Sequence, residues 1–217
     1  MLAVPSLRAE DGHGEAPIGF EAFALLVAKL AKAHREGGRE NPDAYLANLT
    51  ALASRLRTES VPSIDLRRYG GFEPPVELGT LREMDDVTLQ LWRLAPGARF
   101  PARTHGRAHV LTLCLEGECW VKHYEIVGEA PDLDEEGTFR VKKTYERLLR
   151  ASLTSSLTTE RDPIQSLQAG PRGALGLHVT TATEVDRKRA DWSLVEVDRG
   201  SREGFLKLYD ARWLGRP

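Results

Sequence analysis

The stretch PGARFPARTHGRAH, residues 96–109, places two histidines four residues apart, directly before an apolar segment. A third histidine, His178, lies in the segment GALGLHVTTA, and the whole chain contains six. Imidazole nitrogens suit iron, nickel, copper and zinc, so three convergent histidines would form a metal site with positions open to substrate. The alternative is a solvated turn that carries His105 and His109 without binding a metal.

A strand that begins near Thr104 would bring these side chains to one face of a sheet. Alternation with period 2 then places Arg103, His105 and His109 on the same face. In a small barrel, two inward imidazoles can converge on one point. His178, from a neighbouring strand, would complete a set of three.

Two segments near the N-terminus predict the helices that precede these strands. Apolar residues recur at helical spacing over about residues 18–35 and 42–57. Asn41 is suited to the N-cap of the second helix, and Pro42 to its first position. The connection ESVPSIDLRRYGGFEPP, residues 59–75, is rich in proline and glycine and marks a change to period 2.

From Val87 onward the chain is typical of short antiparallel strands. The segment HVLTLCLEGECWVKHYEIVG predicts two strands around a tight turn at 116–118, and ALGLHVTTATEV, WSLVEVD and FLKLYD predict more. Residues 144–168 are ambiguous, with a short helix followed by a loop as one interpretation. We therefore expect a mainly β sandwich or barrel. A helical extension over 1–62 and a barrel over 63–217 would form one structural unit.

Composition narrows the function classes. The 217 residues are 41% hydrophobic and 29% charged, which is typical of a globular protein, and the net charge of −2 attracts neither nucleic acid nor an anionic membrane. No apolar run approaches a membrane span, and no signal peptide is recognisable, so we expect a cytoplasmic protein. Cys114 and Cys119 flank the expected turn, where a disulfide is possible.

The histidine segments resemble two sequence motifs of the cupin superfamily. Gly97, His105 and Gly117 in PGARFPARTHGRAHVLTLCLEG follow the spacing of the first motif, G-x5-H-x-H-x3,4-E-x6-G, and GPRGALGLHVTTA is similar to the second, with His178 as its histidine. Within the cupins, the chain most resembles the cysteine dioxygenase type I branch. The likeness runs over about residues 18–210, through the two helices and the segments DLRRYGGF, LQLWRLAPG, GLHVT and LKLYD.

The resemblance implies a cupin double-stranded β-helix, or jelly-roll barrel, with one non-haem Fe²⁺ on three histidines. In this chain those would be His105, His109 and His178, and another divalent metal would suit the same ligands. It further implies that a small thiol and O2 bind at the metal and that the thiol is oxidised to a sulfinate. Tyr209 would have a catalytic role, through a hydrogen bond from its phenol to substrate or to an oxygen species. The alternative for Tyr209 is an ordinary core residue.

The chain departs from the family at two positions of the first motif. Arg103 stands where the first histidine is expected, and a guanidinium does not bind metals. His109 lies near the usual glutamate and would replace the missing ligand, while Arg103 would bind a substrate carboxylate. Val110 occupies the approximate place of the family's thioether-forming cysteine. Two hypotheses remain: a cysteine dioxygenase-like thiol dioxygenase, or a catalytically silent cupin that binds a small molecule or partner.

Overall fold

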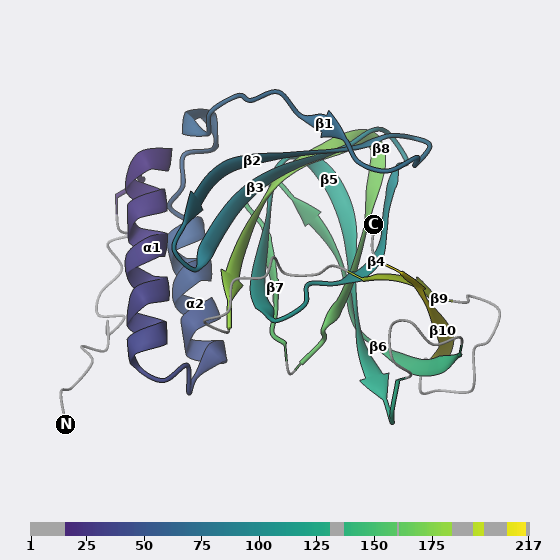
Figure 1. Cartoon of the computed structure of the whole chain (residues 1–217). Helices are drawn as coiled ribbons and strands as arrows, with labels where there is room; N and C mark the ends of the chain where they lie inside the picture. The colour runs from purple at the N-terminus through teal and green to yellow at the C-terminus, as the bar shows by residue number, and fades with distance from the viewer. Residues whose placement is uncertain (1–15, 131–136, 160, 184–192, 198–207, 216–217) are drawn as a thin grey trace.

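The chain folds into a helix pair followed by a β-barrel (Figure 1). The computed structural model describes residues 16–130, 137–159, 161–183, 193–197 and 208–215. Helices α1 (Phe20–Glu36) and α2 (Pro42–Ala53) come first, and a short 3-10 turn, η1 (Thr58–Ser60), follows them. As expected, Asn41 caps α2, because its Oδ1 accepts a 2.9 Å hydrogen bond from the backbone N–H of Ala44.

Within the described ranges, ten strands make up the barrel, and they pair antiparallel with one another. Their bounds are β1 (Arg67–Arg68), β2 (Val76–Met84), β3 (Val87–Leu94), β4 (Arg99–Thr104), β5 (Ala108–Val127), β6 (Phe139–Arg150), β7 (Thr154–Leu157), β8 (Ile164–Ala182), β9 (Leu194–Val197) and β10 (Leu208–Gly215). The expected mainly β, cupin-type jelly roll with an N-terminal pair of helices is confirmed.

A ribbon of two long strands forms the middle of the jelly roll. β5 and β8 pair along most of their lengths, from Ala108 opposite Ala182 to Tyr124 opposite Ile164. The ribbon bends where Gly117 meets Gly173, two glycines with φ of 70° and 78°. A Cβ on Gly117 would lie 2.2 Å from the carbonyl oxygen of Gly173, so only glycine fits there.

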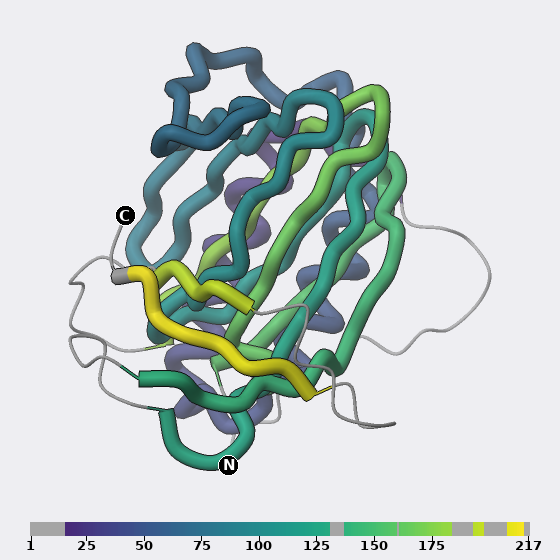
Figure 2. Tube along the Cα trace, turned by 90° about the vertical axis from the view of Figure 1, so that its right-hand side faces the viewer, coloured from purple at the N-terminus to yellow at the C-terminus, as the bar shows by residue number. Residues whose placement is uncertain are grey.

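The bend divides the strands into two sheets that face each other. Sheet I has the order β1-β2-β3-β8-β5-β7, and sheet II contains β4, β8, β5 and β6. The helices cover the outer face of sheet I. β9 and β10 lie across the outer face of sheet II, and Figure 2 shows them in front of this sheet. β9 pairs with β4 and β10 pairs with β6, so the two strands connect the edges of sheet II.

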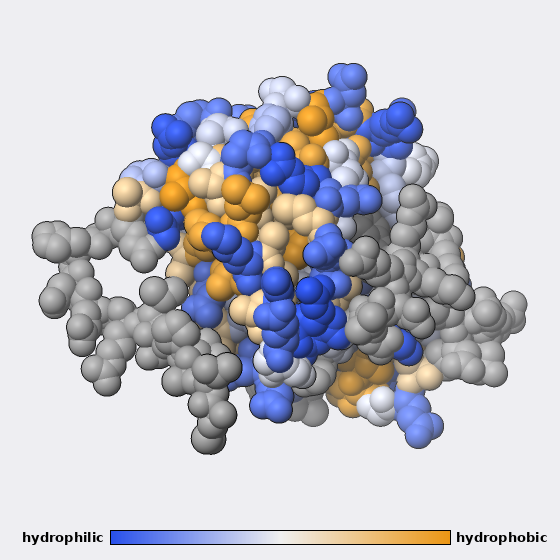
Figure 3. All heavy atoms as spheres, turned by 60° about the vertical axis from the view of Figure 1, so that its left-hand side comes forward, coloured by the Kyte–Doolittle hydropathy of each residue, from blue (hydrophilic) through white to orange (hydrophobic). Residues whose placement is uncertain are grey.

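In the described residues the core has one layer between the helices and sheet I, another between the two sheets, and a smaller cluster between sheet II and the β9–β10 pair. Leu111, Leu113 and Leu177 of sheet I pack on α1 and α2, whereas Trp92, Phe100 and Leu149 pack between the sheets. Apolar and charged side chains are interspersed on the face that carries the helices (Figure 3), where Leu25 is 59% exposed. No helix of the described residues is long and apolar enough to cross a membrane.

Three local expectations from the sequence differ from the structure. Residues 116–118 do not form a hairpin turn, because β5 continues through them, with β-bulges that let the ribbon bend. Residues 144–168 contain no helix in their described part; they belong to β6, β7 and β8. Cys114 and Cys119 are buried free thiols rather than a disulfide.

An aromatic cluster joins α1 and α2 to sheet I. His34 stacks on Tyr45 with ring centroids 4.4 Å apart, and the His109 ring lies 5.5 Å from that of His34. The Tyr45 hydroxyl forms a 2.6 Å hydrogen bond with Thr181 Oγ1. Burial, followed by the nearby His34 and Arg39, lowers the pKa of His109 to about 4, so the folded protein favours the neutral ring.

We expect acid to weaken this helix–sheet contact. The unfolded chain protonates His109 near pH 6.5, whereas the folded chain resists protonation down to about pH 4. The contribution is therefore present above pH 6.5 and is lost as the pH falls from there, by on the order of 1–2 kcal/mol after solvent screening. Urea unfolding of the wild type and of His109→Gln between pH 7.5 and pH 4.5 tests this, with a shallower pH slope expected for the variant. Equal slopes would contradict it.

Candidate functional site

Two rows of polar side chains face each other inside the barrel. Residues paired across a ladder share a face, so the register defines each row. The row on sheet I is Gln90, His178, Thr112 and Ser155. The row on sheet II is Arg103, Gln165, His123 and Tyr145.

Hydrogen bonds connect the two rows. Gln165 Nε2 donates to Thr112 Oγ1 over 3.1 Å and lies 3.3 Å from His123 Nε2. Ser155 Oγ and His123 Nε2 form a 2.9 Å hydrogen bond. Because these side chains are buried, each bond satisfies groups that would otherwise lose water without compensation. The network therefore fixes the two sheets at one end of the interior.

Arg103 is a fully buried cation beside this network. Its guanidinium carbon lies 3.5 Å from the centroid of the Phe100 ring, and its Nη1 donates a 3.4 Å hydrogen bond to the Pro101 carbonyl oxygen. Burial lowers the pKa of Arg103 to about 9, with an opposing effect from Tyr69. The guanidinium is therefore still charged at neutral pH, in an interior of low dielectric.

His105 and His178 lie together next to Arg103. Their ring centroids are 5.8 Å apart and the rings are nearly perpendicular, at 87°. Burial first, and then the charge of Arg103, holds the pKa of both imidazoles well below the usual value, so both are neutral at pH 7. Neither ring nitrogen of His178 has a hydrogen-bond partner among the described residues. A neutral imidazole has one N–H and one lone pair, so His178 has the capacity to bind a guest group.

The structure does not bring His109 to the other two predicted ligands. β4 ends at Thr104, and the turn that follows, in which Gly106 has φ of 58°, interrupts the alternation before β5 begins. His109 therefore pairs with Thr181 and points toward the helices, beside His34 and Tyr45.

Tyr209 also lies away from the histidines. It belongs to β10, and its ring centroid is 6.2 Å from that of Tyr124, on the outer side of sheet II. The structure thus brings together Arg103, His105 and His178 of the predicted site residues, and separates His109 and Tyr209 from them.

Sequence reasoning missed the hydrogen-bonded members of the site. Thr112 stands in the otherwise apolar stretch 110–115, and Gln165 stands in a segment that was ambiguous. The available signal is a polar residue at a strand position whose side chain points into the barrel. Alternation along the strand cannot show which positions point inward before the bulges and turns are known.

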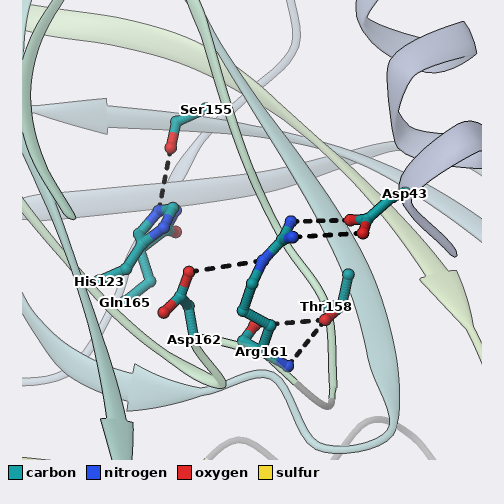
Figure 4. A network of polar contacts seen from close by, with 7 residues as sticks. All are labelled: Asp43, His123, Ser155, Thr158, Arg161, Asp162 and Gln165. Atoms are coloured by element: carbon teal, nitrogen blue, oxygen red, sulfur yellow. Dashed lines mark hydrogen bonds and ion pairs between the residues drawn. The ribbon is translucent and has the colours of Figure 1, made fainter. Parts of the chain in front are cut away.

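The connection between β7 and β8 lies beside the site and contacts the helices. Figure 4 shows Asp162 and Arg161 of this connection near His123 and Ser155. Arg161 pairs with Asp43 of α2 at 2.8 Å and with Asp162 at 3.8 Å. Burial lowers the pKa of His123 to about 4, against the opposing charge of Asp162. This end of the interior is therefore tied to the helix pair.

The residues present fit a three-ligand metal site poorly. In the part of the chain that the structure describes, no three His, Cys, Asp or Glu side chains are grouped to hold a metal ion. His105 and His178 supply two nitrogen donors, but the position of the family's first histidine holds the Arg103 cation. A positive charge beside a dication is unfavourable unless an anion lies between them.

Comparisons with known proteins add a likeness of fold. No protein-family model matches the chain, and no curated protein matches it. Similar solved structures include the Schizosaccharomyces pombe Cnp3 cupin domain, with TM-score 0.42 and 12% identity over 59% of this chain and 76% of that one. KdgF from Halomonas sp. gives a TM-score of 0.39 and 14% identity, over 57% of this chain and 90% of that one. Recombinant oxalate oxidase in complex with glycolate gives a TM-score of 0.37 and 19% identity, over 50% of this chain and 52% of that one. These neighbours are cupin-type proteins, and at this distance they carry no argument about function.

Proposed function

We propose that the barrel interior binds a small organic anion, with a carboxylate as the preferred group. The observation that supports this most is the fully buried Arg103 guanidinium beside two neutral imidazoles. A guanidinium binds a carboxylate through two parallel hydrogen bonds. This is the binding-protein hypothesis from the sequence, with the chemistry of the ligand added.

The neighbours of Arg103 are suited to the rest of such a ligand. His178 has both ring nitrogens available within the described structure, and one of them is an N–H donor toward an anion. Burial and then the charge of Arg103 hold the pKa of this imidazole well below its usual value, so the ring is neutral at neutral pH. Gln165 lies opposite Arg103 in the pairing of β4 with β8 and adds its side-chain amide to the same row.

Removal of the Arg103 charge should abolish preferential anion binding. We expect acetate, glycolate and succinate to raise the melting temperature more than their amides do, and Arg103→Ala to weaken the carboxylates at least tenfold. A lost partner of a buried charge typically costs a few kcal/mol. Calorimetric titration measures the affinities, with Arg172→Ala, at an exposed arginine, as the matched control. Equal affinities for acids and amides would refute the proposal.

A second candidate is the metal-dependent thiol dioxygenase that the sequence resemblance implies. The observation in its favour is the pair of facing imidazoles, His105 and His178, with the nitrogens of His178 open. Fe²⁺, or another divalent metal on these two histidines, would supply the chemistry that joins a small thiol and O2 into a sulfinate. Arg103 would then bind the carboxylate of a thiol substrate that carries one.

Metal content distinguishes the two candidates. With Arg103 in place we expect less than 0.1 equivalent of iron, zinc or nickel after anaerobic loading and desalting, and no O2 uptake with cysteine, mercaptopropionate or cysteamine, since the cation repels a dication. Elemental analysis of the wild type and Arg103→Ala provides the test. About one equivalent of metal in the wild type, lost in His178→Ala, together with thiol-dependent O2 uptake, would favour the dioxygenase instead. Metal that appears only in Arg103→Ala would show that Arg103 keeps it out.

A further inference from the structure

A cavity lies on the other side of sheet II from the polar rows. Its volume is about 320 Å³, within the range of small-molecule sites, and it is bounded by the outer face of sheet II and by β9 and β10. The residues used below are Arg99, Trp120, Lys122, Tyr124, Lys143 and Tyr209. None of these belongs to the interior rows, and the cavity lies on the face of sheet II opposite to Gln165 and His123. Phe100 and Pro101, which contact Arg103, also line it.

The strand register places the floor residues in three successive rungs. Arg99 pairs with Gln168, which pairs in turn with Trp120. Lys122 pairs with Ser166 on the next rung. Tyr124 pairs with Lys143 on the third rung, after a bulge at Thr144 of β6. Paired residues share a face of the sheet, so cationic, polar and aromatic side chains all project from the floor of one cavity.

The charge of this cavity is positive. Arg99, Lys122 and Lys143 line it, and no described acidic residue does. Glu146, outside the lining, pairs with Lys122 at 3.1 Å and also with Lys143, so three positive charges stand against one negative charge. Arg99 forms no ion pair within the described chain. The excess charge favours an anionic guest at the Arg99 end.

Apart from Ser166 and Gln168, the remaining lining is aromatic and apolar, and it changes with depth. Trp120 is 44% exposed, whereas Tyr124 and Val195 are 8% and 2% exposed. Tyr124 and Tyr209 meet edge to face, at 87°. The cavity therefore has a rim with Trp120 and Arg99, and an apolar inner end beneath β9 and β10. Such walls accommodate a planar ring.

The geometry points to a binding site for an aromatic carboxylate between sheet II and the β9–β10 pair. The ring occupies the inner end against Tyr124, Tyr209 and Val195. The carboxylate lies nearer the rim, where Arg99 and Lys122 bind it and Trp120 covers it. This site goes beyond the proposed function, since it uses a different face of the sheet and a different ligand shape.

Binding of 2-naphthoate, with 2-naphthamide as its uncharged match, tests the proposal. We expect calorimetry on the full chain to show one site for the acid, an affinity at least tenfold weaker for the amide, and weaker binding of the acid at higher salt. Arg99→Gln and Lys122→Gln should each weaken the acid about fivefold or more, and Arg147→Gln, on an exposed arginine of β6 outside the cavity, should not.

Two further variants separate this site from the interior one. Ser166→Trp fills the cavity floor and should abolish naphthoate binding, whereas His178→Gln, in sheet I and outside the cavity lining, should leave it unchanged. The Arg99 and Lys122 variants keep the proposal testable if Ser166→Trp does not fold. Equal affinity for acid and amide, or naphthoate binding that depends on His178 and not on Arg99, would overturn the proposal. No binding of naphthoate at millimolar concentration would overturn it as well.

Discussion

The antiparallel pairing of β5 with β8 is the constraint on which the rest of the molecule depends. This one ribbon supplies the central strands of both sheets, because it bends at Gly117 and Gly173 and continues into the second sheet. The close approach of the two glycines leaves no room for a side chain, so the bend is set by the backbone. Strands that change sheets through bulges form the corners of packed sandwiches.

Alternation along the ribbon then assigns each side chain to one of two environments on each sheet. In sheet I, Leu111, Leu113 and Leu177 meet the helices, while Thr112 and His178 face inward. In sheet II, His123 and Gln165 face the same interior, and their neighbours along the strands face the cavity under β9 and β10. A one-residue change of register would exchange these sets, which is why each bulge matters.

Electrostatics distinguishes the interior from an ordinary apolar core. A buried guanidinium keeps its charge at neutral pH, and that charge helps to hold the neighbouring imidazoles neutral. The same residues therefore form a site with a fixed positive charge and neutral nitrogen donors. Such a site is better matched to an anion than to a metal dication, since the anion reduces the local charge and the dication increases it.

The sequence by itself determined the elements and part of the site. Hydrophobic periodicity and the Asn41–Pro42 cap predicted the helix pair, because these features depend on local spacing, which the sequence carries directly. The resemblance of the histidine segments to cupin motifs predicted a jelly roll with Arg103, His105, His109 and His178 in one place. Tertiary structure decided the rest. The Gly106 turn placed His109 on the opposite face, and the ribbon bend replaced the expected hairpin. Gln165 and His123 met Thr112 and Ser155 only because two distant strands pack face to face, and no spacing within one strand records that contact.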